Sequence, residues 1–529
     1  MYVKKNHLVF YGFLLVLVSC NPQRPREQKA DSTLRTYSTS YKPPVFANDN
    51  RVEKIKNIAP EIQQVIEEHA KQRNIPGIAY GIVVDEELVL SGATGLINLE
   101  EKLSASPRSC FRIASMTKSF TAMAIMKLRD EGRLLLSDPV EKYIPEMSAL
   151  EYLTSDASAI HIENLLTMTA GFPEDNPWGD RQLDEPDQML IDLISDGLSF
   201  SNASSYKFEY SNTGYAILGK IISVVSGKPY QDYIRENILQ PLGMEHTYWE
   251  YDRVPENQLA LGYRWENERW KLEPMLHDGS FGAMGGLITT IVDFSKYVSF
   301  HLSAWPPRND PDEGPVKRST LREMHSPQFT ELDADATDLK GDPCAIISGY
   351  GFGVRIQEDC QGLKWISHGG ALPGFGSRYV FFPEYGVGYM AFCNLTYTAA
   401  YPPEKMKNLL FESNGLQPRV LPVSEILMKR QEQVVQLIQD WETNLEAQIL
   451  AENFYLDRSR ENRMSEIQEV LDRAGKIEKL GECAPNNQLR GNFKYQTENG
   501  TISIFLTLTP EKNPKVQYLN IYFQPEEFP

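Results

Sequence analysis

The spacing of apolar residues changes along the chain and predicts where helices and strands form. An apolar stripe at roughly helical intervals runs from Ile55 to Ile66, which predicts a helix that begins near Arg51. The run "GIAYGIVVDEELVLSGATGLIN" then has two strand-like stretches around Asp85-Glu86-Glu87, which predicts a hairpin. Strand-like stretches return near 350–395, and the segments between are mostly helical. The simplest fold that fits this order is one sheet formed by the strands at the two ends of this region, with a helical insertion between them.

Residues 425–529 have a different pattern and are expected to form a small C-terminal α+β domain. A single apolar stripe predicts one long helix and consists of Leu427, Val434, Ile438, Trp441, Leu445 and Ile449. Strict alternation from Ile502 to Leu508 then follows a predicted Asn499-Gly500 hairpin turn. The run "QPRVLPVS" at 417–424 marks the boundary with the preceding domain, which is expected to span 51–416.

The first twenty residues are expected to be a signal segment. Lys4 and Lys5 precede an apolar run too short to span a bilayer, and Cys20 follows it directly. This arrangement resembles the lipobox of bacterial lipoproteins and implies lipidation of Cys20; the alternative is an ordinary secretory peptide or an N-terminal anchor. Residues 21–50, rich in Pro, Arg, Gln, Ser and Thr, are then a flexible tether. The expected location is the bacterial cell envelope, as a lipid-anchored periplasmic or outer-membrane protein.

Composition narrows the class of protein. A chain of 529 residues is too long for one core, so two or three domains are expected. The formal net charge of -18 has the wrong sign for a nucleic-acid partner. The eight histidines are scattered and include no His-Glu-x-x-His, so no metal and no cofactor are expected.

Five cysteines follow the signal segment, and their spacings match no metal-binding pattern. Cys344 and Cys360 could form a disulfide in an oxidising compartment. Cys110 and Cys393 lie beside apolar runs and are expected to be small buried residues.

The tetrad Ser115-Met116-Thr117-Lys118 is the first candidate for chemistry. Strong helix formers follow it, and Gly132 is a plausible end to the helix. Ser115 would then lie at a helix N-terminus, where free N–H groups stabilise negative charge, with Lys118 one turn along the same face. A desolvated lysine can accept the serine's proton. Alone the tetrad is weak evidence, because Ser204 and Lys207 have the same spacing and a plain helix start explains it equally well.

Two further motifs lie downstream in similar settings. Tyr210-Ser211-Asn212 precedes an apolar helical run, although Tyr-x-Asn also recurs at 518–520. His368-Gly369-Gly370 follows a strand, where glycines let a substrate backbone approach closely. By itself His368 could equally be a strand-end histidine that is bonded to the backbone.

These motifs, in this order and at these separations, resemble those of the penicillin-recognising serine hydrolases. The chain looks most like the class C β-lactamase and D-alanyl-D-alanine carboxypeptidase/esterase branch. The resemblance covers roughly residues 55–400 and extends to the connecting segments "LLTMTAGFP", "PLGMEHT", "LGYRW" and "GGLITTIVDFSKY". It implies an α/β (α+β) β-lactamase/transpeptidase-like fold, in which an antiparallel sheet is flanked by helices beside a mostly helical subdomain.

The resemblance also implies roles for individual residues. Ser115 would be the acyl-accepting nucleophile, and Lys118 and Tyr210 would share the role of base, with the lysine charge lowering the pKa of the phenol. Asn212 would hold the lysine and the substrate amide. The oxyanion would lie between the N–H groups of Ser115 and Ala371.

The third motif departs from that family, in which Lys-Thr/Ser-Gly occupies the place of His368-Gly369-Gly370. His368 would shape one wall and offer a hydrogen-bond donor, but the fixed charge and the hydroxyl that hold a β-lactam carboxylate are missing. Arg378 could supply such a charge, although a solvent-facing edge arginine is the simpler interpretation. Met168 replaces a family histidine and is expected to pack near the site.

The expected function is that of a serine hydrolase acting through a Ser115 acyl-enzyme on a peptide, amide or ester of the D-amino-acyl type. The alternatives are a β-lactamase proper and a catalytically weak envelope lipoprotein that binds peptides. A purely structural lipoprotein leaves the Ser, Lys and Tyr set unexplained. An α/β-hydrolase is disfavoured, because no Gly-x-Ser-x-Gly occurs.

Overall fold

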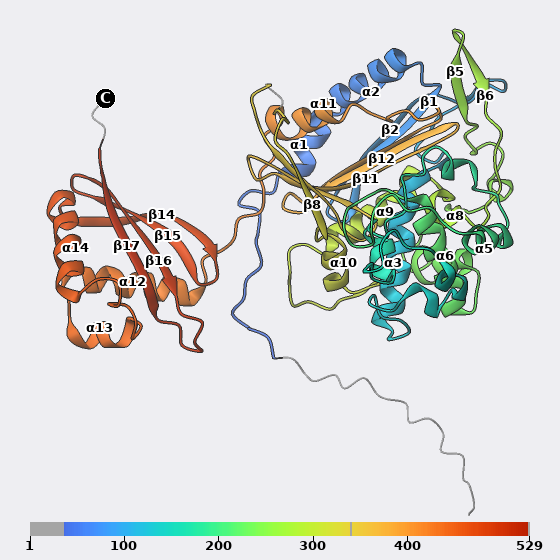
Figure 1. Ribbon diagram of the computed structural model, residues 1–529. Coiled ribbons are helices and arrows are strands. Elements are labelled where there is room, and N and C mark those ends of the chain that lie inside the picture. Colours follow the sequence, from blue (N-terminus) through green and yellow to red (C-terminus); the bar gives the residue numbers. More distant parts are fainter. Residues whose placement is uncertain (1–35, 339–340, 527–529) are drawn as a thin grey trace, which may run out of the picture. The chain divides into compact units, whose positions relative to one another are not determined.

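The computed structural model describes residues 36–338 and 341–526 (Figure 1). Residues 36–41 contain no helix or strand. The predicted signal segment and Cys20 lie outside the described residues. Within the described ranges, no helix is both long and apolar enough to cross a membrane.

A nine-stranded antiparallel sheet forms the centre of the larger domain, with the strand order β3-β2-β1-β13-β12-β11-β10-β9-β8. Its strands are β1 (Gly77–Val84), β2 (Glu87–Asn98), β3 (Leu103–Ser104), β8 (Phe329–Asp333), β9 (Ile346–Tyr350), β10 (Arg355–Asp359), β11 (Lys364–Leu372), β12 (Phe375–Phe382) and β13 (Val387–Cys393). β1 pairs with β13 in a register that runs from Ile78↔Cys393 to Val84↔Val387. The prediction of one sheet built from both ends of the domain is therefore confirmed.

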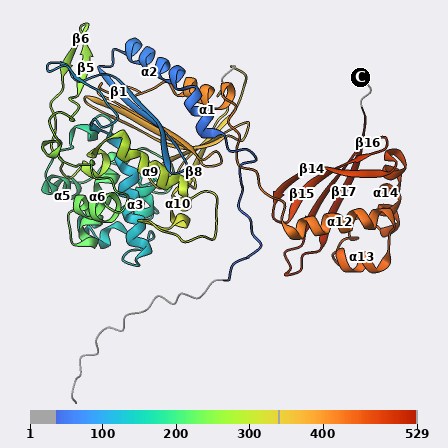
Figure 2. The ribbon, with the colours of Figure 1, turned by 180° about the vertical axis from the view of Figure 1, so that it is seen from behind.

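Helices cover both faces of this sheet, which is why all eight residues of β1 are buried (Figures 1 and 2). One face packs against α1 (Arg51–Asn57), α2 (Ala59–Arg73) and α11 (Pro403–Lys407), which is followed by a π-helical turn at Asn408–Ser413. The predicted first helix thus begins at Arg51 but is broken at Ile58.

The opposite face packs against a larger helical layer and buries the main core. Its helices are α3 (Thr117–Asp130), α4 (Ile162–Leu166), α5 (Asp187–Asp196), α6 (Asn212–Ser226), α7 (Tyr230–Ile234), α8 (Gly282–Gly285), α9 (Ile291–Ser303) and α10 (Arg318–Met324). Two short strand pairs lie in the same stretch of chain: β4 (Phe111–Arg112) with β7 (Ile288–Thr289), and β5 (Tyr263–Glu266) with β6 (Arg269–Leu272). The expected fold class, a sheet with a mostly helical subdomain, is confirmed.

The C-terminal domain has helices first and a four-stranded antiparallel sheet after them. Its elements are α12 (Glu425–Gln439), α13 (Thr443–Ile449), α14 (Arg460–Ala474), β14 (Ile477–Asn487), β15 (Arg490–Thr497), β16 (Gly500–Leu508) and β17 (Val516–Pro525). The prediction of one long helix is wrong: Asp440 leaves the helical region, at φ -147° and ψ 88°, so the apolar stripe is divided between α12 and α13. The predicted hairpin exists, but its turn residues are Glu498 and Asn499, because Gly500 already pairs with Thr497.

Polar contacts join the start of the larger domain to the chain that leaves it. Val45 and Val420 form an antiparallel bridge, inside the range 21–50 for which the sequence predicts a tether. Asp85, in the β1–β2 turn, forms ion pairs with Arg51 and with Arg419, both at 2.6 Å. The chain therefore enters and leaves this domain at one place.

The structure shows which cysteines are paired and which are free, a question that the sequence left open. Cys344 and Cys360 form a disulfide between the chain that leads into β9 and the turn between β10 and β11. Cys110 and Cys393 are free and buried, as predicted, and Cys483 is free and half-buried.

Candidate active site

Ser115 lies in a tight turn immediately before a buried helix. The turn Ala114–Met116 is a 3-10 helix that leads directly into α3, and Ala114 has a φ of 51°. α3 ends near Glu131, and Gly132 follows with a φ of 71°, the left-handed residue that the sequence predicts there. Lys118 lies one turn into the helix, with its Nζ 3.0 Å from Ser115 Oγ. The structure therefore brings the predicted serine and lysine into hydrogen-bond contact.

Lys118 is completely buried and has a full set of acceptors. Its Nζ lies 3.0 Å from Ser115 Oγ, 2.7 Å from Asn212 Oδ1 and 2.9 Å from the backbone oxygen of Met284. Three acceptors match the three hydrogens of an ammonium group. When the amine is neutral, only Ser115 can donate a hydrogen to it, because the amide and backbone oxygens can only accept. The contact with Ser115 is therefore the one through which the neutral amine can take up a proton.

The pKa values of the two predicted bases are shifted in opposite directions. Burial lowers the pKa of Lys118 to about 7, against an opposing influence from Asp180 and Asp175. Burial and the neighbouring Tyr350 raise the pKa of Tyr210 well above its usual value, although a hydrogen bond with Ser115 opposes this. The expectation that Lys118 lowers the pKa of this phenol is not met. Near neutral pH a large fraction of the amine is therefore unprotonated and available as a base, whereas the phenol keeps its proton.

The second motif is fixed by the loop that follows "LLTMTAGFP". Asp175 accepts hydrogen bonds from the backbone N–H groups of Asn212 and Thr213, each at 2.7 Å, and so holds the N-terminus of α6. Asn176 Oδ1 accepts a hydrogen bond of 2.7 Å from Asn212 Nδ2, which turns the amide oxygen of Asn212 towards Lys118. Met168 is buried and accepts a contact of 3.2 Å from the N–H of Ser211, in agreement with its predicted packing near the site.

β11 supplies the wall that faces Ser115. A Cβ on Gly370 would lie 2.2 Å from the backbone oxygen of Ile113 and 2.4 Å from Ser377 Oγ, so only glycine allows this approach of β11 to the serine turn. Gly369 and Ala371 line the cavity on either side of it. The three residues of the third motif and Ala371, which follows them, therefore lie at the cavity that Ser115 opens into.

Both ring nitrogens of His368 are already engaged. Nδ1 lies 2.6 Å from the backbone oxygen of Gly369, which can only accept, so Nδ1 holds the hydrogen. Nε2 then accepts from the Tyr350 hydroxyl at 3.1 Å. Burial and the charge of Lys118 lower the pKa of His368 to about 3. His368 is therefore neutral and has no free donor, contrary to the prediction that it offers one.

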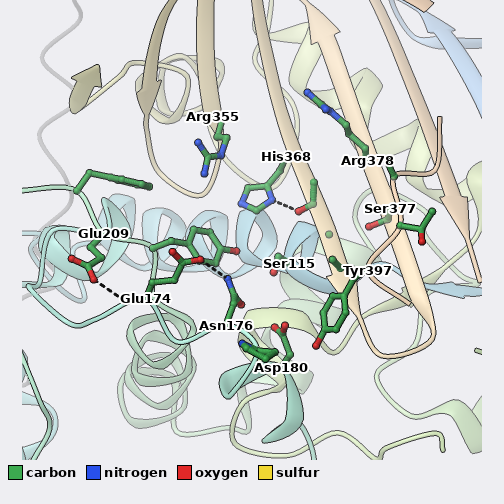
Figure 3. A pocket seen from close by; sticks show the side chains of 18 of the residues that line it. Ser115, Glu174, Asn176, Asp180, Glu209, Arg355, His368, Ser377, Arg378 and Tyr397 are labelled. Atoms are coloured by element: carbon green, nitrogen blue, oxygen red, sulfur yellow. Dashed lines mark hydrogen bonds between the residues drawn. The ribbon is translucent and has the colours of Figure 1, made fainter. Parts of the chain in front are cut away.

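A cavity of about 1050 Å³ surrounds these groups (Figure 3). Besides the predicted residues it is lined by three cations, Lys207, Arg355 on β10 and Arg378 on β12, and by Asp180 and Tyr397. Arg378 lies on a strand inside the sheet, between β11 and β13, so its interpretation as a solvent-facing edge arginine is wrong. Among the described residues, no group of His, Cys, Asp or Glu could hold a metal ion.

Sequence reasoning missed Arg355 and Asp180. Arg355 is exposed, and its guanidinium lies 5.8 Å from the centre of the Phe208 ring. Asp180 lies in a short 3-10 turn, Gly179–Arg181. Neither belongs to a motif, and only the pairing of β10 with β11 and the packing of the loop before Asp180 place them at the cavity. No signal in the sequence could have identified them.

Comparison with known proteins places residues 62–411 within a family model described as Beta-lactamase. Protein flp of Staphylococcus aureus (strain MW2) is 27% identical over 354 residues, which are 66% of this chain and 65% of that protein. Beta-lactamase-like protein 2 of Dictyostelium discoideum is 29% identical over 374 residues, 69% of this chain and 61% of that protein. The matches thus span less than two thirds of the length of these relatives.

Two solved structures share the fold. The octameric penicillin-binding protein homologue from Pyrococcus abyssi has a TM-score of 0.56 at 21% identity, and the alignment covers 88% of this chain and 98% of that one. A penicillin-binding protein from Bacillus halodurans has a TM-score of 0.51 at 23% identity, with 65% of this chain and 99% of that one covered. At these identities the likeness concerns the fold alone.

Proposed function

The chain belongs to the beta-lactamase family, and on that premise we propose that it is a serine hydrolase that acts through a Ser115 acyl-enzyme. The observation that supports this most strongly is the contact of 3.0 Å between Ser115 Oγ and a completely buried Lys118. A buried lysine with its pKa lowered to about 7 can accept a proton at neutral pH. A lysine with only a structural role does not require a lowered pKa.

Acylation begins when Ser115 Oγ attacks the substrate carbonyl and Lys118 takes its proton. The negative charge that develops on the carbonyl oxygen is held by the N–H groups of Ser115 and Ala371. Tyr210, whose phenol keeps its proton, donates that proton to the leaving group and regains one from Lys118. Water then attacks the acyl-enzyme, with the same groups acting in reverse. Asn212 holds Lys118 in place and binds the substrate amide.

The substrate class is a peptide, amide or ester that bears a carboxylate. His368 is neutral and fully engaged, so the third motif supplies no fixed positive charge. Arg355 and Lys207 are both exposed at the cavity and form no ion pair with a described residue. The planar guanidinium of Arg355 can bind a carboxylate through two hydrogen bonds, which makes Arg355 a better anchor for a substrate carboxylate than Lys207. The missing lysine and hydroxyl of the third motif make a peptidase, amidase or esterase a better fit than a β-lactamase proper.

Intact-protein mass spectrometry of the soluble fragment from about residue 45 tests the proposal. The protein is treated with a fluorophosphonate and, separately, with a penicillin, and Ser115→Ala is treated in parallel. A stable adduct on the wild-type protein that is absent from Ser115→Ala is the expected result. A penicillin adduct that turns over rapidly would favour the β-lactamase. Absence of any adduct with either reagent would favour the catalytically weak binding lipoprotein.

We also propose that Cys20 is lipidated and anchors the protein in the bacterial cell envelope. The support is the sequence alone, a basic start, a short apolar run and Cys20 directly after it. Incorporation of a clickable fatty acid into the full-length chain, and its loss in Cys20→Ser, is the expected result. Equal labelling of both proteins would contradict it.

A further inference from the structure

Tyr397, at the rim of the cavity, has a strained backbone that packing of its side chain does not explain. Its φ is 50°, in the left-handed region, and it is the only aromatic residue with a positive φ in the described part of the chain. Asparagine and glycine adopt this conformation at little cost, whereas a bulky side chain is strained in it. The side chain is 43% exposed, so burial of the ring offsets little of that strain.

The residues on either side of Tyr397 hold this conformation in place. The N–H and the hydroxyl of Thr396 donate to the backbone oxygen of Tyr263, at 2.8 Å and 3.1 Å. Thr398 Oγ1 donates to the backbone oxygen of Thr396 at 3.0 Å and so bridges Tyr397. A Cβ on Gly376 would lie 1.7 Å from the backbone oxygen of Thr398, so β12 lies directly against this segment. Strain that several contacts maintain in this way is typical of functional sites.

The strand order places most charged groups of the cavity at one end and Tyr397 at the other. Arg355 lies on β10, on one side of β11, whereas Tyr397 follows β13, on the other side. Figure 3 shows this division about Ser115, and it also shows the side chain of Arg378 extending away from the serine. The other charged residues at the Arg355 end are Lys207, Glu174, Glu209 and Glu331.

The Tyr397 end of the cavity is short. Asp180 closes it with a carboxyl that is only 3% exposed, and the hollow behind Asp180 measures about 20 Å³. The Tyr397 hydroxyl lies beside this carboxyl in Figure 3 and forms a hydrogen bond with it, which fixes the ring at the rim. A group that extends from Ser115 towards this end therefore meets a ring that is held in place.

We propose that Tyr397 is a specificity-determining residue that limits the size of the acyl group, and that its strained backbone is retained for this role. This inference rests on the proposed serine hydrolase function, in which Arg355 binds the substrate carboxylate and the acyl group extends to the opposite end of the cavity. Small acyl groups fit beside the ring, and bulky ones collide with it. The protein is less stable than it would be with an asparagine at this position, and it gains selectivity.

The test compares p-nitrophenyl acetate with p-nitrophenyl cyclohexanecarboxylate, which share a leaving group and differ in the size of the acyl group. The soluble fragment is used as wild type, Tyr397→Asn and Glu268→Asn. Glu268 has a φ of 56° in the turn between β5 and β6, outside the cavity, so its variant relieves similar strain without changing the site.

The measured quantity is the ratio of kcat/KM for the acetate to kcat/KM for the bulky ester. In the wild type it should exceed the ratio of the spontaneous hydrolysis rates by at least about tenfold, because one extra methylene in a fitted pocket is worth about 10- to 200-fold. Tyr397→Asn should lower the ratio by at least about tenfold and raise Tm by about 1 to 3 °C, because the strain is relieved. Glu268→Asn should raise Tm to a similar extent and keep the wild-type ratio.

Fluorophosphonate labelling of Ser115 in every variant separates the possible failures. An unchanged ratio in Tyr397→Asn would overturn the size limit, and so would a wild-type ratio equal to that of spontaneous hydrolysis. A lower Tm in Tyr397→Asn would overturn the claim that strain is retained for selectivity. If Ser115 is labelled but neither ester is hydrolysed, the size limit is overturned and the nucleophile stands. If Ser115 is not labelled at all, the proposed function itself fails.

Discussion

The protonation of Lys118 should control the rate at which Ser115 reacts. Because burial lowers the pKa of Lys118 from 10.5 to about 7, the amine is about one tenth neutral at pH 6 and about nine tenths neutral at pH 8. The perturbation is a change of pH over this range, and the reaction is labelling of Ser115 by a fluorophosphonate. The second-order rate constant should rise about tenfold between pH 6 and pH 8, with a midpoint near 7 and a plateau above 8.

The size of the effect follows from the cost of burial. The difference between 10.5 and about 7 corresponds to roughly 5 kcal/mol of preference for the neutral amine. A lysine with its ordinary pKa would instead give a rate that rises tenfold for each pH unit without a plateau below about pH 10. His368 does not titrate in this window, since its pKa lies at about 3. Stopped-time labelling read by intact mass measures the rate constants.

Two variants assign the midpoint to Lys118. Lys118→Met should lower the rate constant by about 10²- to 10⁴-fold and remove the pH dependence. In Asp180→Asn the midpoint should move to lower pH, because the charge of Asp180 raises the pKa of Lys118. A profile that is flat between pH 6 and 8, or one that Lys118→Met leaves unchanged, would refute the assignment of Lys118 as the base.

Three further predictions concern other parts of the larger domain. Tyr210→Phe should slow amide hydrolysis by about 10²- to 10⁴-fold, because an amine leaving group needs the phenol's proton. The rate of fluorophosphonate labelling should fall much less, and an equal fall in both rates would contradict this role of Tyr210. Gly370→Ala should lower Tm clearly, because the new Cβ would lie 2.2 Å from the backbone oxygen of Ile113. Gly369→Ala should leave Tm nearly unchanged, because its Cβ would have its nearest contact at 3.8 Å; similar Tm shifts in both variants would refute the steric argument. The buried residues His301 and His325, whose ring nitrogens lie 2.7 Å apart, both have lowered pKa values in the folded protein. Below pH 6.5 the unfolded chain therefore binds more protons than the folded protein, and the free energy of unfolding should fall by roughly 1.4 kcal/mol per histidine for each pH unit. Urea denaturation between pH 7 and 5 measures this, and the slope in His301→Gln should be smaller; an unchanged slope would count against the pair.

The sequence was sufficient to predict the positions of the motif residues, because each motif lies at a point where one element gives way to another. Ser115 and Lys118 are neighbours through helical geometry alone, so their contact needs no tertiary information. The third motif is similar, because a glycine beside a strand indicates a close approach, and the contacts of Gly370 confirm one. Here the local pattern and the tertiary structure agree.

Electrostatic properties could not be predicted in the same way. The pKa of Tyr210 depends on how much water its phenol loses, and that depends on distant elements such as β9, which supplies Tyr350. The donor expected from His368 is absent for a related reason, because Gly369 and Tyr350 already occupy both its nitrogens. Residue type and spacing contain no information about either effect.

The break between α12 and α13 shows the limit of periodicity as evidence. The apolar positions from Leu427 to Ile449 keep helical spacing across the break, so the pattern alone indicates one helix. The structure divides them at Asp440, and both helices still contribute to one core. Periodicity therefore identified which side chains are buried, but it did not show whether the backbone between them is continuous.

The pairing of β1 with β13 has a consequence for the order of events during synthesis. β1 is complete by residue 84, but its partner on one side is not made until residues 387–393 emerge. Until then, β1 can pair only with β2, and its other edge is an apolar template for aggregation. The contact order of this domain is correspondingly high, and the loop that must close before the sheet forms spans about 300 residues. A nascent chain that stalls before residue 387 therefore cannot complete the centre of its own sheet, and one edge of β1 stays unpaired until the last strands are made.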